Sequence, residues 1–426
     1  MIAEIIAAGS EMLTPFRQDT NSLYLTAALN ELGVSVAFKT IVGDNLEHLT
    51  AAARTALGRA DIVLFSGGLG PTEDDLTREA AAAALGRPLH RSPELLAGLH
   101  TRFAARRIPM PPNNAKQADV LEGAEILDNA HGSAPGQFLD LELDPEQYPE
   151  LAGQRRIVIL LPGPPKELKP LFDHACKPRL AALLPPRHLA KRLVRMALIP
   201  ESQVDARTAP IYKQYADVET TILAHSGEIQ LHFLCSKPTQ EEAEARVNEL
   251  TGAIEQEMDD AIFSAQGESL EEVVLLMLGL RNLSLACAES CTGGLLAERL
   301  TAVPGSSRYF LGGAVVYSDH LKTVFAGVPA DLIATHGPVS EPVARALAEG
   351  IRARTGASLG IGITGIAGPG PGAPGPDETK PIGLVYIAVA DAAETHVKEL
   401  HLQGDRERIR WWASQHALEM VRRSLL

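Results

Sequence analysis

The feature that most constrains the fold is the alternation of short apolar segments with helix-like segments through residues 1–175. Strands that alternate with helices form a largely parallel sheet with helices packed on its faces. Because the ligands of such sheets bind beyond the carboxyl ends of the strands, functional groups are expected in the loops that follow the strands. The predicted strands cover residues 2–8, 34–42, 61–66 and 156–161, and the predicted helices cover residues 21–32, 46–58, 74–86 and 166–183.

The pattern changes after Pro185 and Pro186, and it changes again at the Gly267-Glu268-Ser269 stretch. Between these points, strands at 189–198, 218–224 and 228–235 and helices at 201–215 and 239–258 predict a small α+β module. Beyond them, α/β alternation resumes and ends in a helix at 405–424. We therefore expect an α/β protein in which two three-layer α/β/α domains, residues 1–184 and 266–426, are joined by an α+β module, residues 185–265. Between predicted strands of the last domain, the Gly/Pro-rich segment 367–376 is either a loop over a site or a tolerated insertion.

The composition excludes several classes of protein. The chain of 426 residues is 45% hydrophobic and 22% charged, which is typical of folded globular proteins. Its net charge of -14 disfavours nucleic acid as a partner, because phosphate backbones are bound mainly by Lys and Arg. The first residues lack the basic region and cleavage site of a signal peptide, and no apolar run approaches the roughly 18 residues of a membrane span. We therefore expect a cytoplasmic protein without membrane contact, whose scattered cysteines are reduced.

Ser290 lies where a predicted strand turns into a helix, in the segment Ala288-Glu289-Ser290-Cys291-Thr292-Gly293-Gly294. Gly293 and Gly294 allow a close backbone approach, and the N–H groups at a helix start favour an anion or a developing oxyanion. Ser290 can therefore be a nucleophile or part of a phosphate-binding turn. The alternative is that Ser290 only caps the helix.

A nucleophilic serine needs a base, and the candidates lie in the segment from Val315 to Lys322. Tyr317 and Lys322 can reach one cleft, and a lysine acts as a base when burial or a neighbouring charge lowers its pKa. Lys322 is otherwise an ordinary surface lysine, and His320 is an alternative base. A glycine-rich turn at 362–370 also follows a predicted strand, so Thr364 and the amides after it either bind a phosphate or form a tight turn.

These segments resemble the C-terminal domain of the competence/damage-inducible protein CinA family. The resemblance rests on residues 288–294, 304–307, 312–318, 336–341, 362–369 and 380–383. It implies a nicotinamide-nucleotide amidohydrolase that converts nicotinamide mononucleotide to nicotinate mononucleotide and ammonia. It implies Ser290 as the nucleophile, Lys322 as the base and Tyr317 as an assisting group.

The same resemblance implies roles for further residues of this domain. Ser307 and Thr364 orient the substrate or the catalyst, and Arg406 binds the phosphate, with Arg408 and Arg410 as alternatives. Amides at the helix start stabilise the tetrahedral oxyanion, and the route needs no metal or other cofactor. The proline-rich stretch 370–376 is longer than the corresponding stretch of the family pattern, and we expect it to change the shape of the mouth of the cleft.

A second glycine-rich turn, Ser66-Gly67-Gly68-Leu69-Gly70-Pro71-Thr72, follows the strand at 61–66 and is succeeded by Glu73, Asp74 and Asp75. It lacks the Gly-Lys-Ser/Thr ending of a P-loop, although such a turn at a helix start can bind phosphate. The three acidic residues either bind a divalent cation or are ordinary acids of a first helical turn.

With residues 9–13, 19–22, 42–45 and 162–167, this turn resembles the molybdopterin-binding-like domain of the same family, so the resemblance covers the whole chain. It implies a metal-dependent ADP-ribose pyrophosphatase. Asp44, Asp74 and Asp75 are its metal candidates, and the diphosphate or nucleotide contacts are Gly67, Gly68, Thr72, Asn114, Asn129 and Gly163. Leu69 stands where such loops often carry Thr, which removes one hydroxyl. The metal identity is left open.

Within the family the middle module is similar to a KH module, but residues 185–265 lack the Gly-x-x-Gly loop that binds RNA. We expect it to be a spacer or a dimer element, and the chain to form a homodimer with small nucleotides as ligands. Two other functions stay open: a molybdopterin-handling transferase, and a non-enzymatic competence or DNA-recombination partner, which the acidic charge disfavours.

Overall fold

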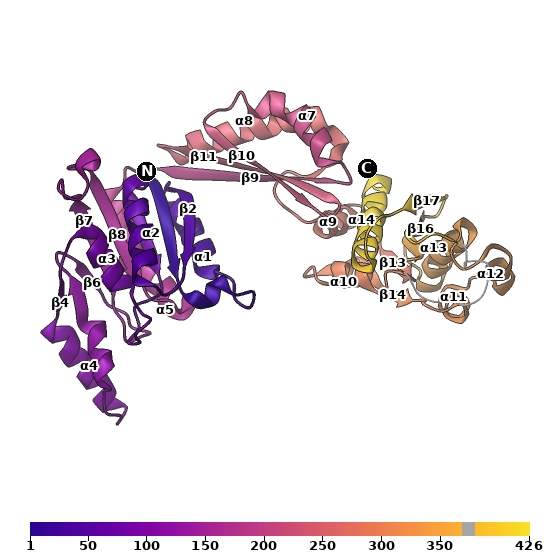
Figure 1. Ribbon diagram of the computed structural model, residues 1–426. Coiled ribbons are helices and arrows are strands. Elements are labelled where there is room, and N and C mark those ends of the chain that lie inside the picture. The colour runs from indigo at the N-terminus through magenta and orange to yellow at the C-terminus, as the bar shows by residue number, and fades with distance from the viewer. Residues whose placement is uncertain (369–379) are drawn as a thin grey trace. The chain divides into compact units, whose positions relative to one another are not determined.

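The computed structural model describes residues 1–368 and 380–426 (Figure 1). The chain forms two compact units, one of Met1–Leu189 with Ser236–Ala243 and one of Ala190–Cys235 with Glu244–Leu426. The predicted fold class is confirmed, since two α/β domains flank an α+β module in the chain. Apart from Ala367 and Gly368, the predicted Gly/Pro-rich loop 367–376 lies outside the described residues.

The N-terminal domain is built on a six-stranded sheet of order β2-β1-β3-β8-β7-β6. Strands β2, β1, β3 and β8 are mutually parallel, while β7 and β6 are added antiparallel at one edge. The central strands are almost entirely buried apolar runs, as expected for parallel strands covered on both faces. The strands are β1 Ile2–Ala8, β2 Ser35–Val42, β3 Ile62–Ser66, β6 Glu125–Leu127, β7 Gly136–Glu142 and β8 Arg155–Leu161, and a separate pair is β4 Leu89–Arg91 with β5 Asp119–Leu121.

Helices α1, α2 and α4 of this domain begin at side-chain caps that the sequence supplies. Asp19 accepts a hydrogen bond from the Ser22 N–H at the start of α1, and Asn45 accepts one from the His48 N–H at the start of α2. The single helix expected over 166–183 is three pieces, because Pro170 cannot donate a backbone hydrogen bond and a π-helical turn, Phe172–Cys176, follows it. The helices are α1 Thr20–Glu31, α2 Leu46–Arg59, α3 Thr77–Leu85, α4 Pro93–Ala105, α5 Pro165–Leu171 and α6 Lys177–Leu183, with 3₁₀ turns at Ser10–Leu13, Pro112–Ala118 and Pro149–Leu151.

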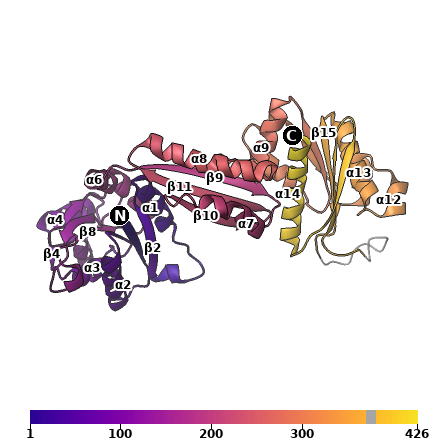
Figure 2. The ribbon, with the colours of Figure 1, turned by 90° about the horizontal axis from the view of Figure 1, so that it is seen from above.

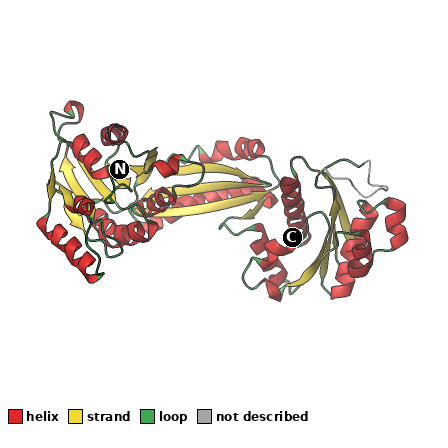
Figure 3. Ribbon diagram, turned by 60° about the horizontal axis from the view of Figure 1, so that its bottom comes forward, coloured by secondary structure: helices red, strands yellow, loops and turns green. Residues whose placement is uncertain are grey.

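The middle module is a four-stranded sheet of order β10-β11-β9-β12 with two helices (Figure 3). The side chains of α8 that are buried recur at helical spacing, Ala243, Val247, Leu250, Ile254 and Met258, so one stripe of the helix packs on the sheet. The elements are β9 His188–Ala197, α7 Glu201–Tyr212, β10 Val218–His225, β11 Glu228–Lys237, α8 Gln240–Met258 and β12 Ile262–Ser264, with a 3₁₀ turn at Asp259–Ala261.

The C-terminal domain has a five-stranded sheet of order β14-β13-β15-β16-β17, in which the first three strands are parallel. Figure 2 shows this sheet edge-on, with α12 and α13 on one face and α9 and α14 on the other. The strands are β13 Leu285–Glu289, β14 Phe310–Val315, β15 Leu359–Gly365, β16 Leu384–Ala390 and β17 Thr395–His401. The helices are α9 Leu270–Leu280, α10 Leu295–Thr301, α11 Asp319–Ala326, α12 Ala330–His336, α13 Glu341–Thr355 and α14 Arg406–Ser424, with a 3₁₀ turn at Ser306–Arg308.

Helix length and composition bear on membrane contact. Within residues 1–368 and 380–426, no helix combines the length and the apolar character that crossing a membrane requires.

Candidate active site

The candidate nucleophile Ser290 directly follows β13, between the ends of two parallel neighbours. Its N–H donates to the carbonyl of Ile363 at 2.9 Å, and the preceding carbonyl, of Glu289, accepts from the Val316 N–H at 2.7 Å. These bonds bring Ser290, Tyr317 and Thr364 to the carboxyl ends of three adjacent strands. The turn predicted to carry the chemistry therefore lies at the edge of the sheet where ligands of α/β domains bind.

Glu289, rather than Ser290, caps helix α10. Its carboxylate is 1% exposed and accepts hydrogen bonds from the backbone N–H groups of Gly294 at 3.1 Å, Leu296 at 3.0 Å and Ala297 at 2.8 Å. The interpretation of Ser290 as a helix cap is therefore wrong, because the orphan amides of the helix are already satisfied. The Ser290 side chain is therefore not needed to cap the start of α10.

The same cap corrects the expected oxyanion site. The Gly293 N–H donates to the Ser290 carbonyl, the Leu295 N–H donates to the Thr292 carbonyl, and the Gly294 N–H is bound to Glu289. Gly293 and Gly294 have φ of +60° and +91°, so they make the turn possible without offering free amides. Any oxyanion donor must therefore lie elsewhere than the first turn of α10.

Lys322 is buried on α11, with 2% of its surface exposed. Its Nζ donates to the Asp319 carboxylate at 3.2 Å, and α11 is capped by Ser318, whose hydroxyl accepts from the Leu321 N–H. The alternative that Lys322 is an ordinary surface lysine is therefore wrong. His320, the other candidate base, is exposed on the same helix.

The three candidate phosphate-binding arginines differ in their contacts. Arg406 donates through Nη2 to the Tyr317 hydroxyl at 2.6 Å, and Tyr317 is 58% exposed. Arg410 donates twice to the Thr292 carbonyl, at 3.0 Å and 2.7 Å, so it supports the turn after Ser290. Arg408 is exposed, and its backbone N–H is taken by the Asp405 carboxylate. Arg406 alone of the three touches a predicted catalytic side chain within the described residues.

Thr364 and Ser307, which were expected to orient the substrate or the catalyst, differ in their burial. Thr364 is fully buried, and its hydroxyl donates to the Pro338 carbonyl at 2.7 Å, which fixes the loop between α12 and α13. Ser307 is exposed in the 3₁₀ turn before β14. Sequence reasoning missed Thr292, whose buried hydroxyl has no hydrogen-bond partner among the described residues.

The neighbouring thiols do not compete with Ser290. Burial raises the pKa of Cys291 to about 12 and raises the pKa of Cys287 well above its ordinary value. All four cysteines are free and buried, as the expectation of reduced thiols required. At neutral pH these thiols are protonated and therefore weak nucleophiles.

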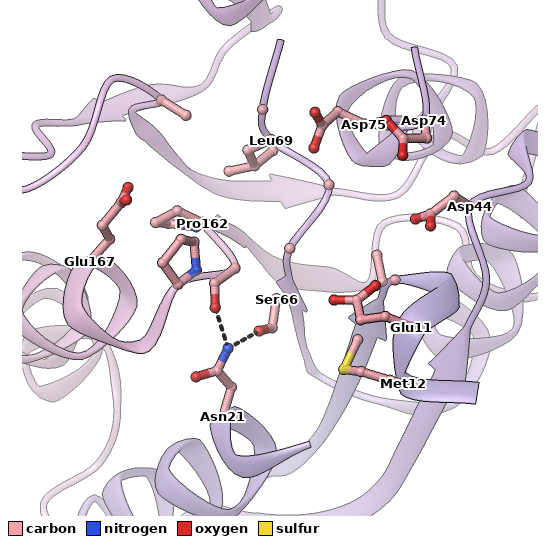
Figure 4. Close-up of a pocket in the computed structure, with 18 of the residues that line it drawn as sticks. Glu11, Met12, Asn21, Asp44, Ser66, Leu69, Asp74, Asp75, Pro162 and Glu167 are labelled. Carbon is pink, nitrogen blue, oxygen red and sulfur yellow. Dashed lines mark hydrogen bonds between the residues drawn. The ribbon is translucent and has the colours of Figure 1, made fainter. Parts of the chain in front are cut away.

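In the N-terminal domain, a cavity of about 430 Å³ lies at the carboxyl ends of the parallel strands (Figure 4). Gly67 and Gly68 have φ of +98° and +69°, and a Cβ there would lie 2.5 Å from the Ala8 carbonyl oxygen or 2.2 Å from the Thr77 hydroxyl. Only glycine fits these two positions. Gly67, Gly68, Thr72 and Gly163 all line the cavity, as predicted residues of a phosphate-binding turn.

A buried arginine that sequence reasoning missed holds this turn. Arg78, at the start of α3, donates to the carbonyl of Leu69 at 2.8 Å and to that of Gly70 at 2.9 Å. The Leu69 side chain, where a Thr hydroxyl would be expected, is buried in the core.

Acidic side chains gather on one side of the cavity. Figure 4 shows Glu11, Asp44, Asp74 and Asp75 there, opposite Pro162 and Glu167. Asp44 accepts from the Ser10 N–H at 2.8 Å, and Asp75 accepts from the Thr72 N–H and hydroxyl. Hydrogen bonding by Thr72 lowers the pKa of Asp74. Within the described residues, no three acidic, His or Cys side chains stand close enough together to form a metal-binding cluster.

The structure separates Asn114 and Asn129 from the cavity lining. Asn129 instead donates to the Glu167 carboxylate at 2.8 Å, and Glu167 lines the cavity. Sequence reasoning missed the lining residues Gln117 and Ser133, whereas Asn21 and Glu167 belong to the segments 19–22 and 162–167 that carry the family resemblance. Gln117 is 2% exposed, donates to the Ser133 hydroxyl at 3.1 Å, and keeps a buried Oε1 without a partner in the described part of the chain.

Three family models match successive parts of the chain. Residues 267–425 match the family described as CinA C-terminal domain, residues 4–182 match the probable molybdopterin binding domain, and residues 191–264 match the damage-inducible protein CinA KH domain. A CinA-like protein from Acidobacterium capsulatum is 60% identical over all of both chains, and one from Koribacter versatilis is 58% identical over all of both. A putative competence-damage inducible protein from Moorella thermoacetica is 42% identical over 100% of this chain and 99% of its own.

Solved structures match parts of the chain. The crystal structure of the protein CinA with unknown function from Thermoplasma acidophilum is 30% identical, covers 42% of this chain and 99% of its own, and has a TM-score of 0.36. The competence/damage inducible protein from Agrobacterium tumefaciens is 34% identical, covers 37% of this chain and 93% of its own, and has a TM-score of 0.34. Because full-length relatives at up to 60% identity align over the whole sequence, the chain belongs to the CinA family.

Proposed function

We propose that the C-terminal domain is a nicotinamide-nucleotide amidohydrolase that deamidates nicotinamide mononucleotide. The observation that carries the proposal is the burial of Lys322 on the helix that follows β14, the parallel neighbour of β13, the strand that Ser290 directly follows. A serine freed from capping and a buried lysine are the two groups that a serine-lysine amidase requires. The bond between Arg406 and Tyr317 adds a cation beside them for the nucleotide phosphate.

The proposed reaction has two halves. Lys322 takes the proton of the Ser290 hydroxyl, and Oγ attacks the carboxamide carbon to give a tetrahedral intermediate. Lys322 then gives the proton to the leaving nitrogen, ammonia departs, and an ester joins Ser290 to the nicotinoyl group. Lys322 then takes a proton from a water molecule, whose oxygen attacks the ester carbon, and returns that proton to Ser290 Oγ as the oxygen leaves, which releases nicotinate mononucleotide and regenerates the enzyme. Tyr317 assists the proton transfers, and Arg406 holds the phosphate.

The test is turnover by the purified full-length protein. Nicotinamide mononucleotide is incubated with the protein, with and without a divalent-metal chelator, and ammonia and nicotinate mononucleotide are quantified. We expect equal amounts of both products, unaffected by the chelator. No ammonia under either condition would contradict the proposal.

A second activity is favoured by the acidic N-terminal cavity. We propose that this domain hydrolyses the diphosphate of ADP-ribose, with the Gly67-Gly68 turn facing the diphosphate. Carboxylate oxygens are the preferred ligands of a divalent cation, and Asp44, Asp74 and Asp75 line the same cavity, although no three such side chains of the described residues form a preassembled cluster there. These residues would hold the metal, which when bound supplies positive charge to the diphosphate oxygens. Glu11, on the same side, adds a further carboxylate.

This activity has a separate test. AMP and ribose 5-phosphate should form from ADP-ribose only with a divalent cation, and Asp44→Asn should reduce the rate without changing ammonia release. A pterin that copurifies with the protein, in the absence of ADP-ribose turnover, would favour the molybdopterin-handling alternative. A DNA shift at physiological salt would favour the recombination partner.

A further inference from the structure

A second large cavity lies in the unit that contains the middle module and the C-terminal domain. Its volume is about 990 Å³, which is ample for a nucleotide. One wall is the turn between β10 and β11, and the other is the first two turns of α14. The lining residues that the argument uses are His225, Ser226, Arg406, Arg408 and Trp411.

Trp411 supplies an aromatic surface to this cavity. Its indole N–H donates to the Ser226 carbonyl at 2.7 Å, which fixes the ring against the middle module. The Arg299 guanidinium lies 4.2 Å from the ring centroid and covers one face, yet Trp411 is still 37% exposed. A fixed, partly exposed indole is a platform on which an aromatic base can stack.

The guanidinium of Arg408 supplies positive charge to this cavity. Two of the other lining arginines are bound by the protein: Arg195 pairs with Glu228, and Arg410 is held by the Thr292 carbonyl. Among the described residues, no hydrogen-bond or ion-pair partner engages the Arg408 guanidinium, and the Asp405 carboxylate beside it is occupied by the Arg408 N–H. Among the described lining residues, Glu407 is the one acid that these contacts leave unpaired, and the guanidinium groups of Arg406 and Arg408 supply positive charge to the wall formed by α14.

We propose that this cavity binds a nucleotide, with its base stacked on Trp411 and its phosphate at Arg408. Arg406 also lines the cavity, so the phosphate of the bound nucleotide lies beside the group that is proposed to hold the substrate phosphate. That link to the substrate rests on the proposed amidase function, whereas the binding itself does not. The nucleotide is either a free mononucleotide or the second half of a dinucleotide whose nicotinamide half occupies the Ser290 site.

The chain contains two tryptophans, Trp411 and Trp412, so tryptophan fluorescence can report binding in the cavity that Trp411 lines. Full-length Ser290→Ala protein is titrated with AMP, ribose 5-phosphate or inorganic phosphate while tryptophan fluorescence is followed. We expect saturable quenching by AMP, and binding of ribose 5-phosphate or phosphate that is weaker by roughly tenfold or more, because neither carries a base. Trp412→Phe should retain the quenching, and direct binding assays should show weakened AMP binding in Trp411→Leu.

Arg408→Gln should weaken AMP binding by roughly tenfold, and Arg423→Gln, at the other end of α14, should leave it unchanged. Quenching that does not saturate, equal binding of phosphate and AMP, or an Arg408→Gln titration that overlays the parent would overturn the proposal. Saturating nicotinamide mononucleotide distinguishes the two sources: it displaces NAD if the dinucleotide spans both sites, and it leaves AMP bound if the nucleotide is free. A protein that releases no ammonia but shows this quenching loses the proposed function and keeps this site.

Discussion

The cap formed by Glu289 leads to a quantitative prediction. In Glu289→Gln one acceptor oxygen becomes an NH2 group, which cannot accept from a backbone N–H. Since one carboxylate oxygen accepts from Gly294 and Leu296 and the other from Ala297, at least one charge-assisted bond is lost and a buried donor is left facing another donor. A hydrogen bond to a charged group contributes about 1.5–3 kcal/mol and an unsatisfied buried group costs about 1–3 kcal/mol, so we expect about 3 kcal/mol.

Hydrogen exchange measures this loss where it occurs, without unfolding the other domains. A change of about 3 kcal/mol in the local opening free energy corresponds to exchange faster by roughly 100-fold at the amides of Gly294, Leu296 and Ala297. The matched control is Glu298→Gln, because Glu298 is exposed on the same helix. Exchange at these amides within a few-fold of the parent would refute the assignment of Glu289 as the cap.

Three further perturbations test other parts of the account. Arg406→Gln should raise KM for nicotinamide mononucleotide by roughly tenfold in steady-state ammonia assays, whereas a KM equal to that of the parent would exclude a phosphate contact. Burial lowers the pKa of His416 from 6.5 to about 4, so the unfolded chain binds more protons between these values, and this contribution to stability, present above pH 6.5, is lost by about 1.4 kcal/mol per unit as pH falls through that window. His416→Phe should therefore show a smaller drop in urea midpoint between pH 7 and pH 5, and an equal drop would contradict the burial effect. Asp44→Asn should slow ADP-ribose turnover at least tenfold at fixed metal concentration, and excess metal should restore part of it; an unchanged rate would remove Asp44 from the metal site.

The strands and the turns after them could be predicted because apolar runs bounded by glycine carry a strong local signal. Ile2–Ala8 was predicted to the residue, and the turn at Ser290 was placed at the correct end of its strand. The segment between residues 87 and 155 carried no such signal, since its strands are three residues long or sit at an antiparallel edge.

Contacts between distant side chains could not be predicted. Glu289 caps a helix that starts six residues after it, outside the usual capping position, so no local pattern revealed it. Lysines are rarely buried, and only the packing of α11 shows that Lys322 is. Asn129 was expected to contact the ligand, but it is Glu167, to which Asn129 donates, that lines the cavity.

The central claim is that Ser290 is the nucleophile of a nicotinamide-nucleotide amidohydrolase. It is tested most directly by ammonia release from nicotinamide mononucleotide in Ser290→Ala and Cys291→Ala proteins, each shown to be folded by its circular dichroism. Because the Cys291 thiol is buried with a pKa of about 12, its loss should leave turnover within a few-fold of the parent. The account predicts no enzymatic ammonia release from Ser290→Ala, and full activity of that variant would contradict it.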